Sequence, residues 1–325
     1  MKKKFNFTFL RITISFFFLY IILSKSQIKF KEVFDILKDV HLPTLILAYI
    51  LLFLINIPLA LRFKYILEIY FEKNLSSFFI LKLTMIGLFF NNFLPTSAGG
   101  DIVKIFYIVK DEKKKFLSGI SVLIDRYIGA LTVMTMGTIS IFFYKGTEGK
   151  IYYSIIIFFI LLIFSFYFFS KREFATIFYS PIKKFIPPFL NEKLLNFYNS
   201  IHFYFTQNRK NLRIAISISF LLQILSIFSQ YLLSISIIKH NLQILPFFIF
   251  IPLIWTSTLI PSLGGLGIRE FTYISLFSDF IGKENAYVLS LLVLTNIILN
   301  SLIGGIIFLI SGIKQSNLIM ERKKF

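Results

Sequence analysis

The chain has 325 residues, of which 56% are hydrophobic and 16% are charged, and its mean hydropathy is +0.77. Soluble domains are about 45–50% apolar and about a quarter charged, so these values exclude a water-soluble globular domain. The absence of cysteine excludes a disulfide framework, a cysteine-ligated metal site and thiol catalysis.

The net charge of +19 would suggest nucleic acid as the partner of a soluble protein. Here the Lys and Arg residues lie between apolar blocks, where the positive-inside rule places them, so we expect anionic lipid headgroups beside them and no nucleic acid. The three histidines lie far apart and form no metal-binding motif, and no ATP-binding loop or GxSxG motif is present. We therefore expect no cofactor, no metal site and no catalytic residue.

Eight apolar blocks follow one another, each long enough to cross much of the roughly 30 Å hydrocarbon core as a helix. They lie at residues 7–23, 42–61, 75–94, 116–143, 151–169, 212–238, 244–260 and 286–311. The first follows a basic tail, but no small-residue cleavage site follows it, so we predict an uncleaved span. The prediction is an all-α polytopic membrane protein with one domain over residues 1–325, whose halves cover about 5–143 and 151–311.

The segments rich in Lys and Arg orient this domain. They are the N-terminal tail, residues 104–115, residues 171–213 and the C-terminal tail, whereas 144–150 and 239–243 are poor in both. We place the rich segments and both termini in the cytoplasm, and the protein in the cell membrane. Two segments, 24–41 and 191–207, have apolar residues at helical spacing and are predicted to lie on the membrane surface.

The number of crossings must agree with this orientation. Block 75–94 lies between two segments predicted to be cytoplasmic, and residues 244–285 must return to the outside before the last span. We therefore predict six full spans plus two re-entrant hairpins that enter from opposite sides, an inverted repeat. The alternative is a plain eight-span bundle.

Two polar elbows interrupt the blocks, one at residues 91–104 and one at 261–270. Each has a proline, then small residues, then Gly-Gly, and a cation (Lys104, Arg269) four residues after the second glycine. The breaking residues are Pro95, Gly99, Gly100, Pro261, Gly264, Gly265 and Gly267. Paired interruptions of this kind point to a transporter's substrate site, and a helix start beside a cation suits a phosphate. The alternative is two glycine-rich turns with their cations among headgroups.

Asp125 and Arg126 lie inside the apolar stretch 116–143, where an unpaired charge costs several kcal/mol. Adjacent helix residues diverge by about 100°, so each needs its own partner on another helix. The candidates are Lys104 or Arg269 for Asp125, and Asp101 or Glu270 for Arg126. A purely structural ion-pair network is the alternative. Arg62, at the end of the second span, is interpreted first as an interfacial anchor.

These residues resemble the lysylphosphatidylglycerol synthase transmembrane-region family, the flippase-like membrane proteins, over about residues 10–312. The features that carry the resemblance are Arg62, Asn92-Phe93-Leu94-Pro95, residues 100–104, Asp125-Arg126 and, most specifically, residues 261–270. The resemblance implies movement of aminoacylated phosphatidylglycerol or another polar lipid between leaflets. Some relatives carry a glycosyltransferase domain, which points instead to polyprenyl-linked sugars. The sequence ends at Phe325, so we expect no aminoacyl-transferase domain and no lysyl transfer by this polypeptide.

The leading hypothesis is a lipid translocase whose substrate has a phosphate-bearing headgroup. Its predicted substrate-binding residues are Arg62, Asn92, Asp101, Lys104, Asp125, Arg126, Arg269 and Glu270. One rival is a membrane partner for a separately encoded transferase, and another is an intramembrane enzyme with Asp125 or Glu270 as general acid or base. The lipid, the direction, the energy source and the choice between monomer and homo-oligomer stay open.

Overall fold

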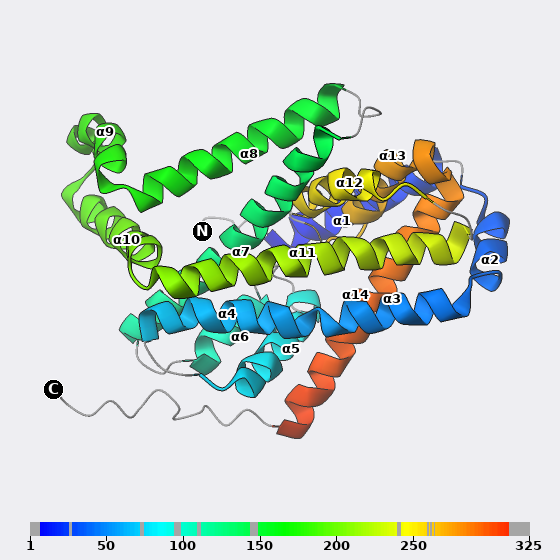
Figure 1. The fold of residues 1–325 in the computed structure, drawn as a ribbon, viewed down its shortest axis with the longest axis horizontal. Helices are drawn as coiled ribbons and strands as arrows, with labels where there is room; N and C mark the ends of the chain where they lie inside the picture. Colours follow the sequence, from blue (N-terminus) through cyan, green and yellow to red (C-terminus); the bar gives the residue numbers. More distant parts are fainter. Residues whose placement is uncertain are drawn as a thin grey trace.

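The computed structural model describes residues 7–25, 28–71, 75–93, 99–108, 112–143, 149–238, 242–258, 260, 262 and 264–311. Every regular element in these ranges is helical, which confirms the predicted all-α class (Figure 1). The helices are α1 (Phe7–Lys25), α2 (Phe30–Lys38), α3 (Leu42–Leu54), α4 (Asn56–Phe71), α5 (Ser77–Phe93), α6 (Gly99–Ile108), α7 (Glu112–Ile141), α8 (Gly149–Ser170), α9 (Arg172–Ile182), α10 (Pro188–Thr206), α11 (Arg209–Ile238), α12 (Leu245–Ser257), α13 (Ile268–Ile281) and α14 (Lys283–Ser311), with a 3₁₀ turn at Lys183–Phe185.

Four helical segments in the described part of the chain are long and apolar enough to cross a membrane. They are Leu42–Phe71, Lys115–Ile141, Arg209–Ile238 and Lys283–Ser311. The pair Ile155–Ser170 and Arg172–Pro181, bent by 98° at Lys171, makes a fifth if it is counted as one span. The protein is therefore a multi-pass helical membrane protein, and four or five of the six predicted full spans meet the length criterion.

The first long span is two helices, α3 and α4, joined at Ile55. Pro58 in the first turn of α4 has no N–H to donate to the carbonyl of Leu54, which interrupts the hydrogen-bond ladder there. The Asn56 side chain satisfies a neighbouring carbonyl instead, because its Nδ2 donates to the Phe53 oxygen at 2.8 Å. The break therefore places a polar amide in the middle of an apolar span.

Two helix pairs form hairpins that open toward opposite ends of the bundle. The start of α5 and the end of α6 share a core with Phe71 at the end of α4. In the other pair, Phe247 at the start of α12 contacts Phe277 and Phe280 near the end of α13. Helix α11 runs between these two ends, with Leu212 near the first and Ile237 near the second. Helices α5 (17 residues) and α12 (13 residues) are shorter than the roughly 20 residues of a straight span.

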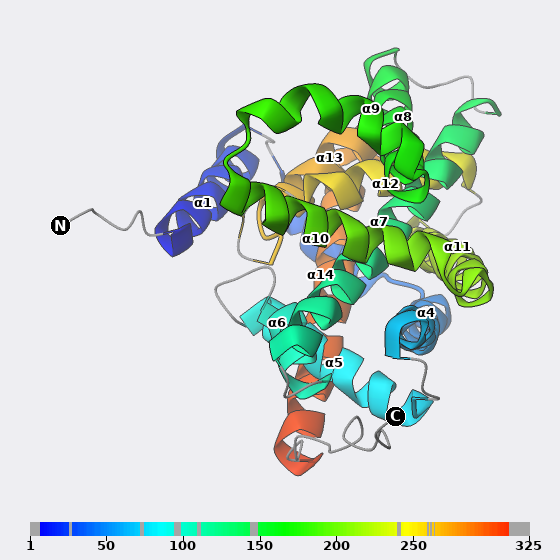
Figure 2. The same cartoon turned by 90° about the vertical axis from the view of Figure 1, so that its left-hand side faces the viewer.

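Glycines set the closest approaches of the first hairpin. A Cβ on Gly100 would lie 1.8 Å from the backbone oxygen of Gly87, so α5 and α6 touch through their backbones. A Cβ on Gly304 would lie 2.0 Å from the Met85 oxygen, which brings α14 equally close to α5. Small residues allow such packing in membrane helices. Figure 2 shows the result, with α5 and α6 beside α14 and away from α8 and α9.

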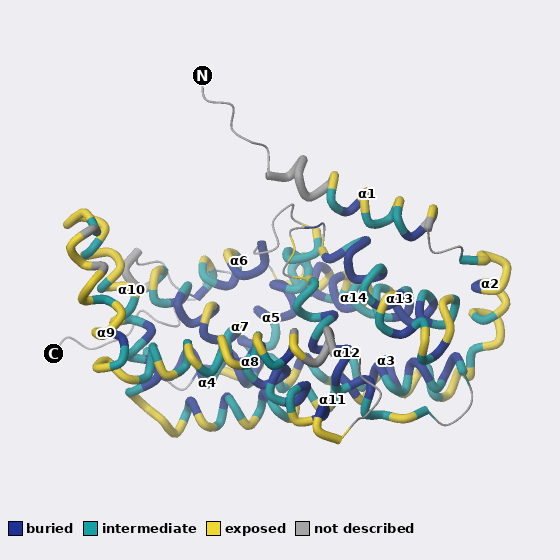
Figure 3. Tube along the Cα trace, turned by 90° about the horizontal axis from the view of Figure 1, so that it is seen from above, coloured by how far each residue is buried: buried dark blue, intermediate teal, exposed yellow. Residues whose placement is uncertain are grey.

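Both segments predicted to be surface helices contain a helix, and their position on a membrane surface stays a prediction. The segment 24–41 contains α2, which buries Val33 and leaves Phe30 and Phe34 exposed. The segment 191–207 lies in α10, which buries Ile201 and Phe205. Helices α9 and α10 lie at one end of the bundle and α2 at the other (Figure 1). Exposed residues dominate α9, whereas the buried ones gather in the middle of the bundle (Figure 3).

Candidate functional site

The first elbow ends at the start of a helix that carries two charged side chains, Asp101 and Lys104. Gly99 and Gly100 open α6, and the Asn91 side-chain oxygen accepts from the Gly100 N–H at 2.8 Å. Asp101 lies in the first turn of α6, where the helix dipole favours a carboxylate. Pro95 lies outside the described residues. The packed glycines therefore hold Asp101 at the tip of the α5–α6 hairpin.

Asp101 binds two cations. The Arg126 Nε donates to its Oδ2 at 2.7 Å, and the Arg126 Nη2 contacts the same oxygen. The Lys104 Nζ lies 4.0 Å from its Oδ1 and 5.1 Å from the centre of the Phe63 ring. Asp101 was one of the two partners predicted for Arg126, and the structure selects it. Together these three side chains carry one excess positive charge.

Exposure differs sharply inside this cluster. The side chains of Lys104 and Asp101 are 10% and 11% exposed, whereas that of Arg126 is 48% exposed. Arg126 lies in the middle of α7, a helix apolar enough to span a membrane. Buried Asp101 therefore holds the Arg126 guanidinium, while about half of the Arg126 side chain is exposed in the middle of the span.

Asp125 has a different partner from the two predicted. Arg62 of α4 holds it by two hydrogen bonds, Nε to Oδ1 at 2.7 Å and Nη2 to Oδ2 at 3.0 Å. The Nη1 of Arg62 also donates to the Ser219 hydroxyl of α11 at 2.9 Å. The prediction of Lys104 or Arg269 as the partner was therefore wrong. Helix α4 packs against both α7 and α11, and the planar guanidinium of Arg62 matches the two oxygens of a carboxylate.

The interpretation of Arg62 as an interfacial anchor was also wrong. Its side chain is 6% exposed and that of Asp125 is 10% exposed. A Cβ on Gly129 would lie 3.1 Å from the Arg62 Nη1, so this glycine gives the guanidinium its space in α7. Arg62 and Asp125 form a buried, neutral pair that joins three helices.

The second elbow forms a self-contained pair. The Arg269 Nη2 donates to the Glu270 Oε1 at 2.8 Å, and both side chains are buried. The other Glu270 oxygen accepts from the Gly267 N–H at 2.6 Å, which caps α13. Gly264, Gly265 and Gly267 all have positive φ, so the turn depends on glycine at these positions. Pro261 lies outside the described residues.

The tips of the two elbows approach each other at Asn92. A Cβ on Gly264 would lie 3.4 Å from the Asn92 Oδ1. The Asn92 Nδ2 donates to the Leu88 oxygen at 3.1 Å and to the Ser301 hydroxyl of α14 at 2.6 Å. Asn92 therefore lies where the α5–α6 hairpin, the second elbow and α14 meet.

A cavity of about 240 Å³, lined by apolar side chains and by amide and hydroxyl groups, lies beside Asn92, and sequence reasoning missed it. Its hydrogen-bonding side chains are Asn56, Asn92, Ser226, Gln230, Asn296, Asn300 and Ser301. Asn56 donates to Asn300 at 2.7 Å, and Asn300 donates to the Asn296 oxygen at 2.9 Å. A usable signal was present, since Asn296 and Asn300 are four residues apart and share one face of an apolar helix.

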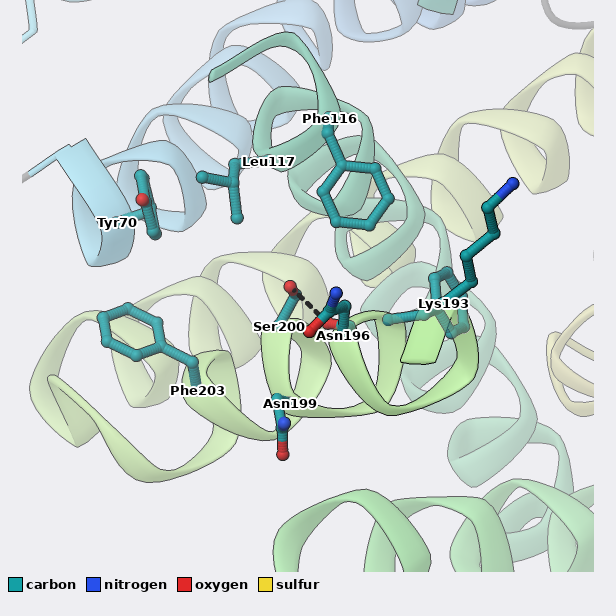
Figure 4. Close-up of a pocket in the computed structure, with 9 residues that line it drawn as sticks. Tyr70, Phe116, Leu117, Lys193, Asn196, Asn199, Ser200 and Phe203 are labelled. Atoms are coloured by element: carbon teal, nitrogen blue, oxygen red, sulfur yellow. Dashed lines mark hydrogen bonds between the residues drawn. The ribbon is translucent and has the colours of Figure 1, made fainter. Parts of the chain in front are cut away.

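A larger surface groove of about 850 Å³ lies between α10 and the start of α7 (Figure 4). Its lining is mainly aromatic and amide side chains with one cation: Tyr70, Phe116, Leu117, Lys193, Asn196, Phe197, Asn199, Ser200 and Phe203. None of the predicted site residues lines it. Across the described residues, no group of three or more His, Asp or Glu side chains could hold a metal ion.

A polytopic helical membrane protein with paired charges inside its spans is the class that this fold and site define. Residues 8–304 match the family described as the lysylphosphatidylglycerol synthase TM region, and the chain belongs to that family. It is also 26% identical over 297 residues to the UPF0104 membrane protein MJ1595 of Methanocaldococcus jannaschii, with 86% of this chain and 87% of that protein covered. No solved structure matches the chain. The resemblance stated from the elbow motifs is thus confirmed, and neither match indicates a catalytic domain.

Proposed function

We propose that this protein moves a phosphate-bearing polar lipid between the two leaflets of the cell membrane. One observation carries the proposal: Arg126 lies in the middle of an apolar span, 48% exposed, in a cluster with one excess positive charge. Lys104 and Arg126 share the single carboxylate of Asp101, and a lipid phosphate would supply a second anion for these two cations. Aminoacylated phosphatidylglycerol and polyprenyl-linked lipids are the candidate substrates.

In this proposal the arriving phosphate competes for the cations that hold Asp101. Arg126 offers a planar fork and Lys104 a point charge from the neighbouring helix. The pairs Arg62–Asp125 and Arg269–Glu270 are neutral and buried, and in this proposal they support the structure and do not bind the phosphate. The lipid tails remain in the bilayer while the headgroup crosses through the protein.

The proposed topology has six full spans (α1, α3–α4, α7, α8, α11 and α14) and two re-entrant hairpins (α5–α6 and α12–α13). Both termini are cytoplasmic, and the halves form an inverted repeat. The opposite directions in which the hairpins open support this arrangement. Access would alternate as the halves rock about the hairpin tips.

Fluorescent-lipid scrambling in proteoliposomes tests the function. The native protein should move at least one anionic phospholipid from a broad panel, and Arg126→Ala should reduce that rate by about tenfold or more, as expected for the loss of a charge-assisted phosphate contact. Arg126→Lys should retain part of the rate.

The matched control is Arg213→Ala, which removes an exposed arginine at the start of α11, away from the cluster. It should scramble at the native rate. A native protein that moves no lipid, or an Arg126→Ala variant as active as Arg213→Ala, would reject the proposal.

Two other functions are weaker. A separately encoded transferase is the second candidate partner, favoured by the groove between α10 and α7 (Figure 4). Its co-purification with a protein that moves no lipid would support that role.

Headgroup chemistry by Asp125 or Glu270 is disfavoured, because each carboxylate already accepts hydrogen bonds from a guanidinium and neither lines the cavities described above.

A further inference from the structure

The cavity beside Asn92 differs in chemistry from the charged cluster. Its polar lining consists of amides and hydroxyls from α4, α5, α11 and α14, and none of its lining residues carries a charge. Amides inside membrane spans are costly unless they are hydrogen-bonded. Four helices bring such groups to one point, so the cavity is a built feature of the interior and not a chance gap.

Much of this lining is fixed by the protein itself. Asn300 is held between Asn56 and Asn296, and Gln230 accepts a hydrogen bond from the hydroxyl of Tyr273 on α13. Asn56, Asn300 and Gln230 are 6%, 7% and 8% exposed. A preorganised set of donors and acceptors is what a hydroxyl group needs in order to leave water without loss.

The cavity also lies next to the proposed phosphate site. The stem of Lys104 packs on Gly87, where a Cβ would lie 2.6 Å from its Cε, and the next residue, Leu88, lines the cavity. Consecutive helix residues diverge by about 100°, so neighbouring faces of α5 border the charged cluster at Gly87 and the neutral cavity at Leu88.

We propose that this cavity binds an uncharged, hydroxyl-bearing headgroup, a glycerol unit or a single sugar ring, attached to the phosphate held by Arg126 and Lys104. The inference rests on the proposed function and names its substrate class. The volume of about 240 Å³ equals roughly eight water molecules at about 30 Å³ each, which suits one such unit. An ammonium group is disfavoured here, because it would have no carboxylate to pair with.

This selectivity has a consequence for the substrate. Phosphatidylglycerol or a phosphosugar lipid fits the cavity, whereas phosphatidylethanolamine or a lysylated headgroup would place a cation in it. The full-length protein in detergent, titrated with dihexanoyl lipids that differ only in headgroup, tests this by thermal shift. Phosphatidylglycerol or phosphatidylinositol should reach half-saturation at an about tenfold lower concentration than phosphatidylethanolamine or phosphatidylcholine. A preference for phosphatidylglycerol would identify the ligand as a glycerol headgroup, and a preference for phosphatidylinositol would identify it as a sugar-like ring.

Substitutions at Asn296 sharpen the test, since this residue lines the cavity and is only partly buried. Asn296→Leu should abolish the preference between headgroups, and Asn296→Asp should shift it toward phosphatidylethanolamine. Thr295→Leu is the matched control, because Thr295 is the exposed neighbour on α14 and does not line the cavity. It should keep the native preference, and equal unliganded melting temperatures would show that all three variants fold.

The outcomes for the cavity and for transport are separable. Equal binding of all four headgroups, tighter binding of an ammonium headgroup, or an unchanged preference in folded Asn296→Leu would overturn the inference while leaving translocation intact. Selective binding that depends on Asn296, in a protein that moves no lipid in vesicles, would support the cavity and reject the transport proposal.

Discussion

At the scale of residues, the buried Arg62–Asp125 pair and the Asp101–Lys104–Arg126 cluster differ in net charge and in exposure. Arg62 and Asp125 are buried and neutralise each other through a bidentate contact, with Ser219 as a third partner. In the cluster of Asp101, Lys104 and Arg126, two cations share one carboxylate, and Arg126 is the most exposed of the three side chains. This difference separates a pair that supports the structure from a cluster that suits an anionic ligand.

The Arg62–Asp125 pair predicts a non-additive double-mutant cycle. Arg62→Met alone or Asp125→Leu alone leaves one buried charge unpaired and should destabilise the protein by about 3–5 kcal/mol. The double variant should recover most of that loss, because it removes both charges together. Thermal unfolding of the purified variants measures this, and a double variant as unstable as either single one would contradict the assigned pairing.

At the scale of elements, the α5–α6 hairpin depends on backbone contact. Gly100 and Gly87 touch where the hairpin narrows, and this contact sets the position of Asp101 one residue later. A helix pair of 17 and 10 residues has little apolar area of its own, so it relies on α14 and α4 around it. The glycine contact between α5 and α6 therefore sets the position of Asp101 at the tip of the hairpin.

Gly100→Ala tests this dependence. Its Cβ would lie 1.8 Å from a backbone oxygen, so the two helices must move apart, and we expect a lower melting temperature and weakened scrambling. Gly119→Ala in α7 is the control, because its Cβ would meet only the Ile105 Cδ1 at 3.7 Å. Alanine raises helix propensity by about 1 kcal/mol, so this control should be as stable as the native protein or more so. Equal melting temperatures for the two variants would refute the role of the contact.

At the scale of the whole molecule, the two halves are packed into each other. The most extensively packed helix pairs include α5 with α14 and α4 with α11, and each joins the first half to the second. The neutral cavity, the Asn92–Gly264 approach and the Arg62–Ser219 bond all lie on this boundary. A rearrangement of one half against the other would therefore change all three at once.

The inverted-hairpin topology is tested by cysteine labelling, for which the cysteine-free sequence is a natural background. Lys115→Cys and Lys210→Cys lie at the end of the bundle where α7 and α11 begin, and both should react from the cytoplasm. Lys38→Cys and Lys283→Cys lie near the opposite end, where the His41 N–H binds the Ser236 oxygen, and should react from outside. Labelling of positions 115 and 283 from the same face would exclude the topology.

The sequence by itself determined the membrane class, the helical blocks, the family and the two elbows. Hydropathy, glycine and proline act locally along the chain, and for this reason the apolar blocks at 42–61 and 212–238 and the turn at 264–267 could be predicted. Only the tertiary structure decided which polar and charged side chains contact each other. Asp125 binds Arg62, 63 residues away, and Asn56 meets Asn300, 244 residues away. Such contacts depend on which helices pack together and at what rotation, and that is set by glycine packing and helix crossing across the whole bundle.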